Sequence, residues 1–103
     1  MINEIQNLTS QQAESHLQTA LFIDVREAFE LPSGMITGAK HIPLGQFLTQ
    51  SEILEELPRD KKIIVYCQHG VRSLTAAKHL QANGFSDIAN LSGGIVQWGG
   101  KLV

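Results

Sequence analysis

Cys67 is the one cysteine of this 103-residue chain, and it begins a short loop whose composition could activate a thiol. The loop consists of Cys67, Gln68, His69, Gly70, Val71, Arg72 and Ser73. It lies between a β-branched apolar run and a segment with helical spacing, so its backbone N–H groups can converge at a helix N-terminus. Gly70 permits a positive φ, and Arg72 adds positive charge. The pattern predicts a thiolate at Cys67 and an anionic substrate beside it.

An unreactive cysteine is the alternative interpretation, because free cysteine is among the most frequently buried residue types. A single cysteine excludes an internal disulfide, a Cys-x-x-Cys redox pair and a cysteine-rich zinc site. His16, His41 and His79 share no ligand spacing with Cys67 or with one another. We therefore expect no metal ion and no cofactor, and the residues alone leave the choice between a buried and a reactive thiol open.

Composition predicts one globular domain over residues 1–103, with 43% hydrophobic and 17% charged residues. No run approaches the roughly 18 apolar residues of a membrane helix, and no secretory leader is visible, so we expect a cytoplasmic protein without membrane contact. The net charge of −2 argues against nonspecific nucleic-acid binding. The region 61–103 nevertheless holds five Lys and Arg residues against Asp87 alone, which favours a small anion near Cys67 if folding keeps these charges together.

Apolar strand-like runs alternate with helical segments, a pattern typical of an α/β fold. Strands are expected at 2–5, 21–25, 39–42, 62–66 and 88–91. Helices are expected at 9–18, 45–57 and 72–83, with a short helix carrying Trp98 and at most a short helix and a loop in 27–38. These elements predict a mostly parallel central sheet of four to five strands with helices on both faces. Functional residues of such a sheet lie beyond the carboxyl ends of its strands, where Cys67 stands.

Four short motifs follow one another between residues 24 and 98. They are Asp24-Val25-Arg26-Glu27, Gly38-Ala39-Lys40-His41-Ile42-Pro43, Cys67-x-x-Gly70-x-Arg72-Ser73 and Gly93-Gly94-Ile95-Val96-Gln97-Trp98. In this order they resemble the motifs of the rhodanese family, the thiosulfate sulfurtransferases, and the length is that of a single-domain member. Met35 is a departure, because the family often has histidine there, and it leaves the catalytic loop untouched.

The resemblance implies a double-displacement sulfur transfer. Cys67 would attack the outer sulfur of thiosulfate or another sulfane donor, expel sulfite and hold the sulfur as a persulfide, which cyanide or an acceptor thiol then removes. The implied substrate-binding residues are Gln68, His69, Gly70, Val71, Arg72 and Ser73. Arg72 would orient the sulfonate end or support the loop, and His69 would donate to a substrate oxygen or have no mechanistic duty. We expect Asp24 to form a structural hydrogen bond or an ion pair with an arginine, and Trp98 to pack in the core.

Two other functions share some of these features. Cysteine-dependent phosphatases and arsenate reductases also bind an anion between Cys and Arg, but they resemble Cys-x5-Arg, and the interval from Cys67 to Arg72 is one residue shorter. A persulfide carrier that passes sulfur from a partner enzyme to an acceptor protein would need the same loop. The sequence does not separate such a carrier from a free-standing enzyme.

Overall fold

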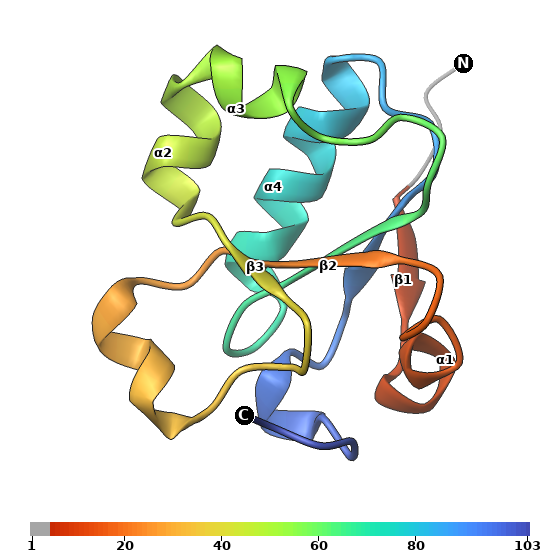
Figure 1. The fold of residues 1–103 in the computed structure, drawn as a ribbon, viewed down its shortest axis with the longest axis vertical. Helices are drawn as coiled ribbons and strands as arrows, with labels where there is room; N and C mark the ends of the chain where they lie inside the picture. Colours follow the sequence, from red (N-terminus) through yellow and green to blue (C-terminus); the bar gives the residue numbers. More distant parts are fainter. Residues whose placement is uncertain (1–4) are drawn as a thin grey trace.

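Five parallel strands form the centre of the structure, a computed structural model that describes residues 5–103 (Figure 1). They are β1 (Gln6–Leu8), β2 (Leu21–Asp24), β3 (Lys40–His41), β4 (Ile63–Tyr66) and β5 (Ile88–Leu91). Their spatial order is β1-β5-β4-β2-β3, and every neighbouring pair is parallel. All four residues of the central strand β4 are buried, which explains its continuous apolar sequence. The predicted parallel sheet is thus confirmed.

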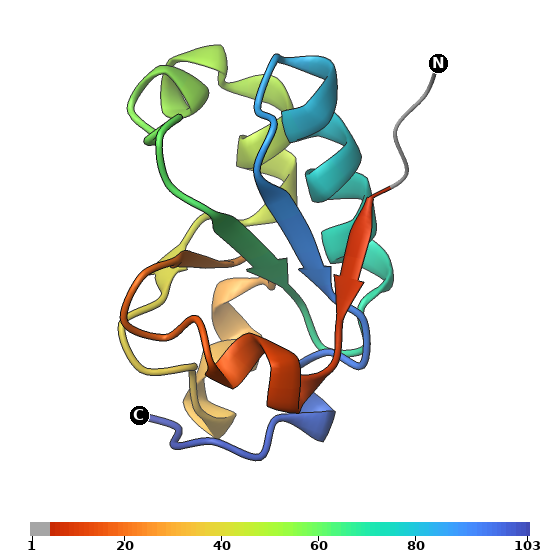
Figure 2. The ribbon, with the colours of Figure 1, turned by 90° about the vertical axis from the view of Figure 1, so that its right-hand side faces the viewer.

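Helices cover both faces of this sheet (Figures 1 and 2). They are α1 (Ser10–Glu14), α2 (Leu44–Thr49), α3 (Ser51–Glu55), α4 (Val71–Ala82) and the 3-10 helices η1 (Ala28–Ser33) and η2 (Ile95–Gln97). Side chains of β4 alternate between two cores: Ile63 and Val65 join the core under α2, α3 and α4, whereas Ile64 and Tyr66 join the core with α1 and η2. Cys67 continues the first set and faces α4.

Trp98 belongs to the second core and is 9% exposed. Its ring meets Phe22 edge to face, with centroids 6.0 Å apart. This packing role is the one expected for Trp98, although it caps the C-terminal end of η2 rather than lying within a helix.

The predicted single helix over 45–57 is wrong, because the chain breaks at Gln50 into α2 and α3. Gln50 has extended dihedrals, φ −106° and ψ 91°, and the residues beside it, Thr49 and Ser51, are exposed. The Thr49 hydroxyl donates to the carbonyl of Gly45 at 2.7 Å. With no core contact through this stretch, nothing offsets the poor helix propensity of its polar residues.

The first helix is also shorter than expected. The predicted capping box forms, with Thr9 and Gln12 bonding reciprocally, but α1 ends at Glu14 and tight turns lead to β2. The Ser15 hydroxyl donates to the carbonyl of Gln12 at 2.7 Å and competes with helix continuation. The strand expected at 2–5 lies almost wholly outside the described residues, and β1 is found at Gln6–Leu8. No helix in the described part of the chain is long and apolar enough to cross a membrane.

Candidate active site

Cys67 directly follows β4 at the carboxyl edge of the sheet, and a tight turn connects it to α4. The turn depends on Gly70, which caps α4 with a φ of 94°. A Cβ at this position would also collide with the backbone carbonyl of Ser92. Only glycine therefore satisfies both the dihedral angle and the close approach, and this brings the first N–H groups of the turn onto the cysteine.

Three groups converge on the Cys67 sulfur, which belongs to a residue only 1% exposed. The backbone N–H groups of Gly70 and Ser73 donate to Sγ at 3.2 and 3.4 Å, and the Ser73 hydroxyl lies 3.4 Å away. Burial, the largest single effect, raises the pKa of the Cys67 thiol, but hydrogen bonds from Ser73, Gly70 and His69 together bring this pKa below its ordinary value. The cysteine is buried, as the alternative interpretation required, yet its surroundings favour the thiolate.

The turn after β5 supports the loop from behind. Ile95 N–H donates to the carbonyl of Cys67 at 2.9 Å, and Val96 N–H donates to that of Gln68 at 3.3 Å. Gly94 makes this approach possible, since a Cβ there would collide with the same Gln68 carbonyl. The Gly93-Gly94 motif and the cysteine loop therefore form one interlocked unit.

Arg72 is held at the mouth of the site by Glu30 of η1. Its Nη1 and Nη2 lie 2.6 and 2.8 Å from the two carboxylate oxygens. The Arg72 hydrogen bonds hold the pKa of Glu30 at about 2, and the same contact raises the pKa of Arg72. The expected surplus of positive charge is thus reduced, because Arg72 meets Glu30 and Lys62 meets Asp87 at 2.8 Å.

A buried ion pair lies beneath the loop. Arg26 contacts Asp24 at 2.8 Å, with both side chains fully buried, and this is the structural partnership expected for Asp24. Arg26 also donates to the carbonyls of Glu30 and Gly34 and, at 3.3 Å, to the side-chain oxygen of Gln68. It therefore ties η1 to the cysteine loop. Its place in the Asp24-Val25-Arg26-Glu27 motif was the sequence signal for this role.

The rim of the site is more apolar than the sequence suggested. His69 and Val71 of the loop are exposed, Val71 by 75%. Two apolar residues on neighbouring segments are exposed as well: Phe29 by 82%, which precedes the Arg72 partner Glu30, and Val96 by 51%, whose N–H donates to the Gln68 carbonyl. A shallow cavity of about 290 Å³ adjoins the loop, lined by Ser33, Gln68, Ile95, Val96, Trp98 and Leu102. Met35 lies on the same side, paired through its backbone with Val103.

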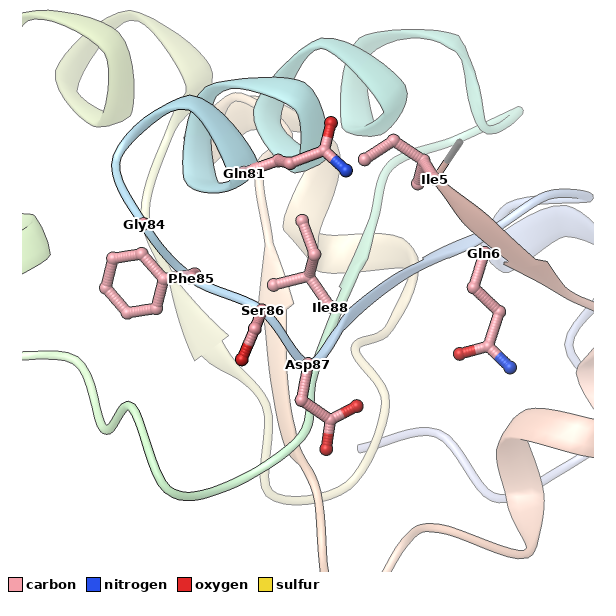
Figure 3. Close-up of a pocket in the computed structure, with 8 residues that line it drawn as sticks. All are labelled: Ile5, Gln6, Gln81, Gly84, Phe85, Ser86, Asp87 and Ile88. Carbon is pink, nitrogen blue, oxygen red and sulfur yellow. The ribbon is translucent and has the colours of Figure 1, made fainter. Parts of the chain in front are cut away.

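Another pocket lies at the amino ends of β1 and β5, with a volume of about 610 Å³ (Figure 3). Its lining residues are Ile5, Gln6, Gln81, Gly84, Phe85, Ser86, Asp87 and Ile88. It is on the opposite edge of the sheet from Cys67, so the chemistry does not use it. Within residues 5–103, no three His, Cys, Asp or Glu side chains are placed to hold a metal ion.

Comparison with known proteins gives a consistent result. The family model described as "Rhodanese-like domain" matches residues 7–101. A protein of Bacillus subtilis named uncharacterized protein YqhL is 41% identical over 98 residues, covering 95% of this chain and 75% of its own. A sulfurtransferase of Allochromatium vinosum is 32% identical over 98 residues, covering 95% and 89%.

Among solved structures, a rhodanese-related protein from Thermoplasma volcanium superposes with a TM-score of 0.85 at 33% identity. The match covers 95% of this chain and 97% of the other. The similarity therefore extends over the whole sheet and the cysteine loop rather than over a fragment.

Proposed function

The chain belongs to the family of rhodanese-like domains, whose similar proteins include sulfurtransferases, and on that premise we propose that it transfers a sulfane sulfur through a persulfide on Cys67. The observation that carries the proposal is the convergence of Gly70 N–H, Ser73 N–H and the Ser73 hydroxyl on one buried sulfur. Donors arranged in this way stabilise a thiolate before the reaction and a negatively charged sulfur during it. A spectator cysteine needs no such donors.

In the first half-reaction the Cys67 thiolate attacks the outer sulfur of thiosulfate. A bond forms between Sγ and that sulfur, the bond to the sulfonate sulfur breaks, and sulfite leaves with the electron pair. The product is a Cys67 persulfide anion. The outer sulfur then occupies the mouth of the loop, where the N–H groups of the turn and the Arg72 guanidinium can offset its charge.

In the second half-reaction a nucleophile attacks the outer sulfur. Cyanide yields thiocyanate, and an acceptor thiol yields a new persulfide with its proton kept by the product. In both cases the bond between the two sulfurs breaks and its electron pair returns to Sγ as thiolate. No electrons enter or leave the cycle, so the transfer requires no redox cofactor. We place the activity in the cytoplasm, where a lone thiol stays reduced.

Intact-protein mass spectrometry after incubation with thiosulfate tests the proposal. We expect a single added sulfur that cyanide removes, and no added sulfur on a folded Cys67→Ser variant. Failure of the folded native protein to gain sulfur from thiosulfate, an alkyl trisulfide or a protein persulfide would overturn the mechanism.

The rim favours a second candidate, in which the acceptor is a cysteine on another protein. Phe29, Val71 and Val96 are exposed apolar residues on three segments that contact one another at the mouth, and aromatic and aliphatic groups near a charged centre are typical of protein-binding surfaces. A small acceptor such as cyanide does not need a contact with Phe29, whose side chain is 82% exposed. Replacing Phe29 by serine should therefore slow transfer to a protein thiol while leaving transfer to cyanide unchanged.

A further inference from the structure

The Ser73 hydroxyl lies between two groups that compete for its single hydrogen. Its oxygen is 3.4 Å from the Cys67 sulfur and 2.5 Å from Oδ1 of Asn90 in β5. All three residues are buried, and none is more than 2% exposed. No bulk water reaches the hydroxyl, so it can donate to the sulfur or to Asn90 but not to both.

The orientation of the Asn90 amide is fixed by its other partners. Its Nδ2 donates to the carbonyl of Gly70 at 3.1 Å and to Oδ1 of Asn7 at 3.2 Å. A backbone carbonyl can only accept, so the nitrogen must face Gly70 and the oxygen must face Ser73. Asn90 therefore presents an acceptor to Ser73. Its Oδ1 accepts the hydrogen bond of the hydroxyl whenever the sulfur does not.

Each form of Cys67 has a different best arrangement. As a thiol, its S–H donates to the Ser73 oxygen and Ser73 donates to Asn90, so every group has a partner. As a thiolate, the sulfur has no hydrogen and carries the charge, so the hydroxyl gains more by turning to it. In a persulfide, Sγ is neutral and a weak acceptor, so the Ser73 hydroxyl again donates to Asn90.

We propose that the Ser73 hydroxyl is a rotating donor, directed to Asn90 in the thiol and persulfide forms and to Sγ in the thiolate, with Asn90 as the positioning residue. This inference rests on the proposed function and deepens it. When the acceptor breaks the bond between the two sulfurs, the electron pair moves to Sγ. The Ser73 hydroxyl then rotates and donates its hydrogen bond to the new thiolate. When the thiolate attacks a donor, the Ser73 hydroxyl rotates back and donates its hydrogen bond to Asn90. The electron pair of the sulfur is then free to attack.

The ionisation of Cys67 gives a test with a distinctive sign. Because the chain has one cysteine, thiolate absorbance and alkylation rate against pH report this residue alone. Ser73→Ala should raise the pKa of Cys67, since the thiolate loses a donor. Asn90→Ala should lower it, since the hydroxyl is released to the sulfur. The ionisation constant should rise about fivefold in Asn90→Ala, the value of one neutral hydrogen bond, and should fall in Ser73→Ala, because the bond lost there is made to a charged sulfur.

The double variant separates this device from simple disturbance of the loop. With Ser73→Ala in place there is no hydroxyl to release, so adding Asn90→Ala should leave the ionisation constant unchanged. An Asn90 effect that persists in this background, or a rise of the pKa in Asn90→Ala alone, would overturn the proposal. Asn90→Leu, which has nearly the shape of asparagine, gives the same comparison if the alanine variant does not fold.

Asn7→Ala is the matched control, because it removes a partner of Nδ2 and leaves Oδ1 facing Ser73; its ionisation constant should match the native one. None of these variants replaces a charged or titratable residue around the loop. These residues are Asp24, Arg26, Glu30, Tyr66, His69 and Arg72. Discharge of a preformed persulfide should slow about fivefold in Ser73→Ala. If no persulfide forms in the native protein but the signs of the ionisation effects hold, the proposed function fails and the rotating donor stands.

Discussion

Arg72 in the cysteine loop and Glu30 in η1, 42 positions apart in sequence, form a two-pronged contact in which Nη1 donates to Oε1 and Nη2 donates to Oε2. The contact fixes the plane of the guanidinium at the mouth of the site. It also connects α4 with the segment that carries Phe29. Arg72 is thus positioned before any substrate arrives, and its charge is partly offset by Glu30.

Loss of this pair should lower stability in a pH-dependent way. Arg72 holds the pKa of folded Glu30 at about 2, below its ordinary 4.5, so the pair stabilises the folded state above pH 4.5 and this contribution disappears as pH falls towards 2. Glu30→Gln should cost about 1 kcal/mol at neutral pH, since the pair is partly exposed. Urea unfolding at several pH values measures this difference. The exposed Glu55→Gln is the control, and a gap of constant size down to pH 2 would contradict the assignment.

Cys67 should react as a thiolate at neutral pH. Its surroundings lower its pKa, so alkylation by iodoacetamide should continue well below the free-thiol value of about 8.5. The folded protein releases a proton that the unfolded chain keeps, so the thiolate adds stability above the unfolded pKa, and this is lost as pH falls through the folded one. A rate profile with its midpoint at or above the free-thiol value would count against the proposed donors.

Cys67→Ser should abolish sulfur transfer while the fold is kept. The change is nearly isosteric, and the serine hydroxyl can accept from the same N–H groups of Gly70 and Ser73. Circular dichroism and steady-state assays with thiosulfate and cyanide measure the two effects. Residual turnover by the folded variant beyond background would show that the sulfur passes elsewhere.

Substitutions at Gly70, in the cysteine loop, and at Gly38, outside it, separate backbone strain from a steric collision in the loop. Both have a positive φ, 94° and 81°, but only at Gly70 would a Cβ meet a neighbour. Gly38→Ala should cost about 1 kcal/mol from backbone strain and leave the activity intact. Gly70→Ala should cost about 2 kcal/mol or more and reduce transfer strongly, because Ser92 must move. Equal effects on activity would mean that the close approach to Ser92 is unimportant.

Loop length should determine the choice between sulfur and phosphate. The N–H groups of the turn point at a single atom, whereas a phosphoryl group needs three oxygens bound at once. The native protein should transfer sulfur and hydrolyse an aryl phosphate poorly, and inserting one glycine after Gly70 should weaken sulfur transfer. Paired steady-state assays on both folded proteins test this. Rapid hydrolysis by the native loop, or unchanged transfer after insertion, would contradict it.

Local signals predicted the framework of this molecule well. The apolar run of β4, the helical spacing of α4 and the Thr9–Gln12 capping box each lie within one short segment, and each is found in the structure. The position of Cys67 at the carboxyl end of a central parallel strand followed from them. The break at Gln50 did not, because it depends on which side chains find a core to pack against.

Partners that are distant in sequence were not predictable. Nothing near Arg72 indicates that Glu30 will reach it, and nothing in the short strand containing Asn90 indicates a contact with Ser73. Both contacts depend on strand order and register, which bring three separate segments to one edge of the sheet. Such pairings are properties of the assembled fold rather than of any window of sequence.

The interlocked glycine turns also affect the order of events during synthesis. Cys67 and its loop are made before Asn90, Gly94 and Ile95, which hold the loop from behind. A chain emerging from the ribosome therefore exposes its cysteine before the donors around it are fixed, and pairing of β1 with β5 must await synthesis of Ile88–Leu91. During this interval the thiol should behave as an ordinary cysteine. A sudden rise in its reactivity at neutral pH would then mark the completion of folding.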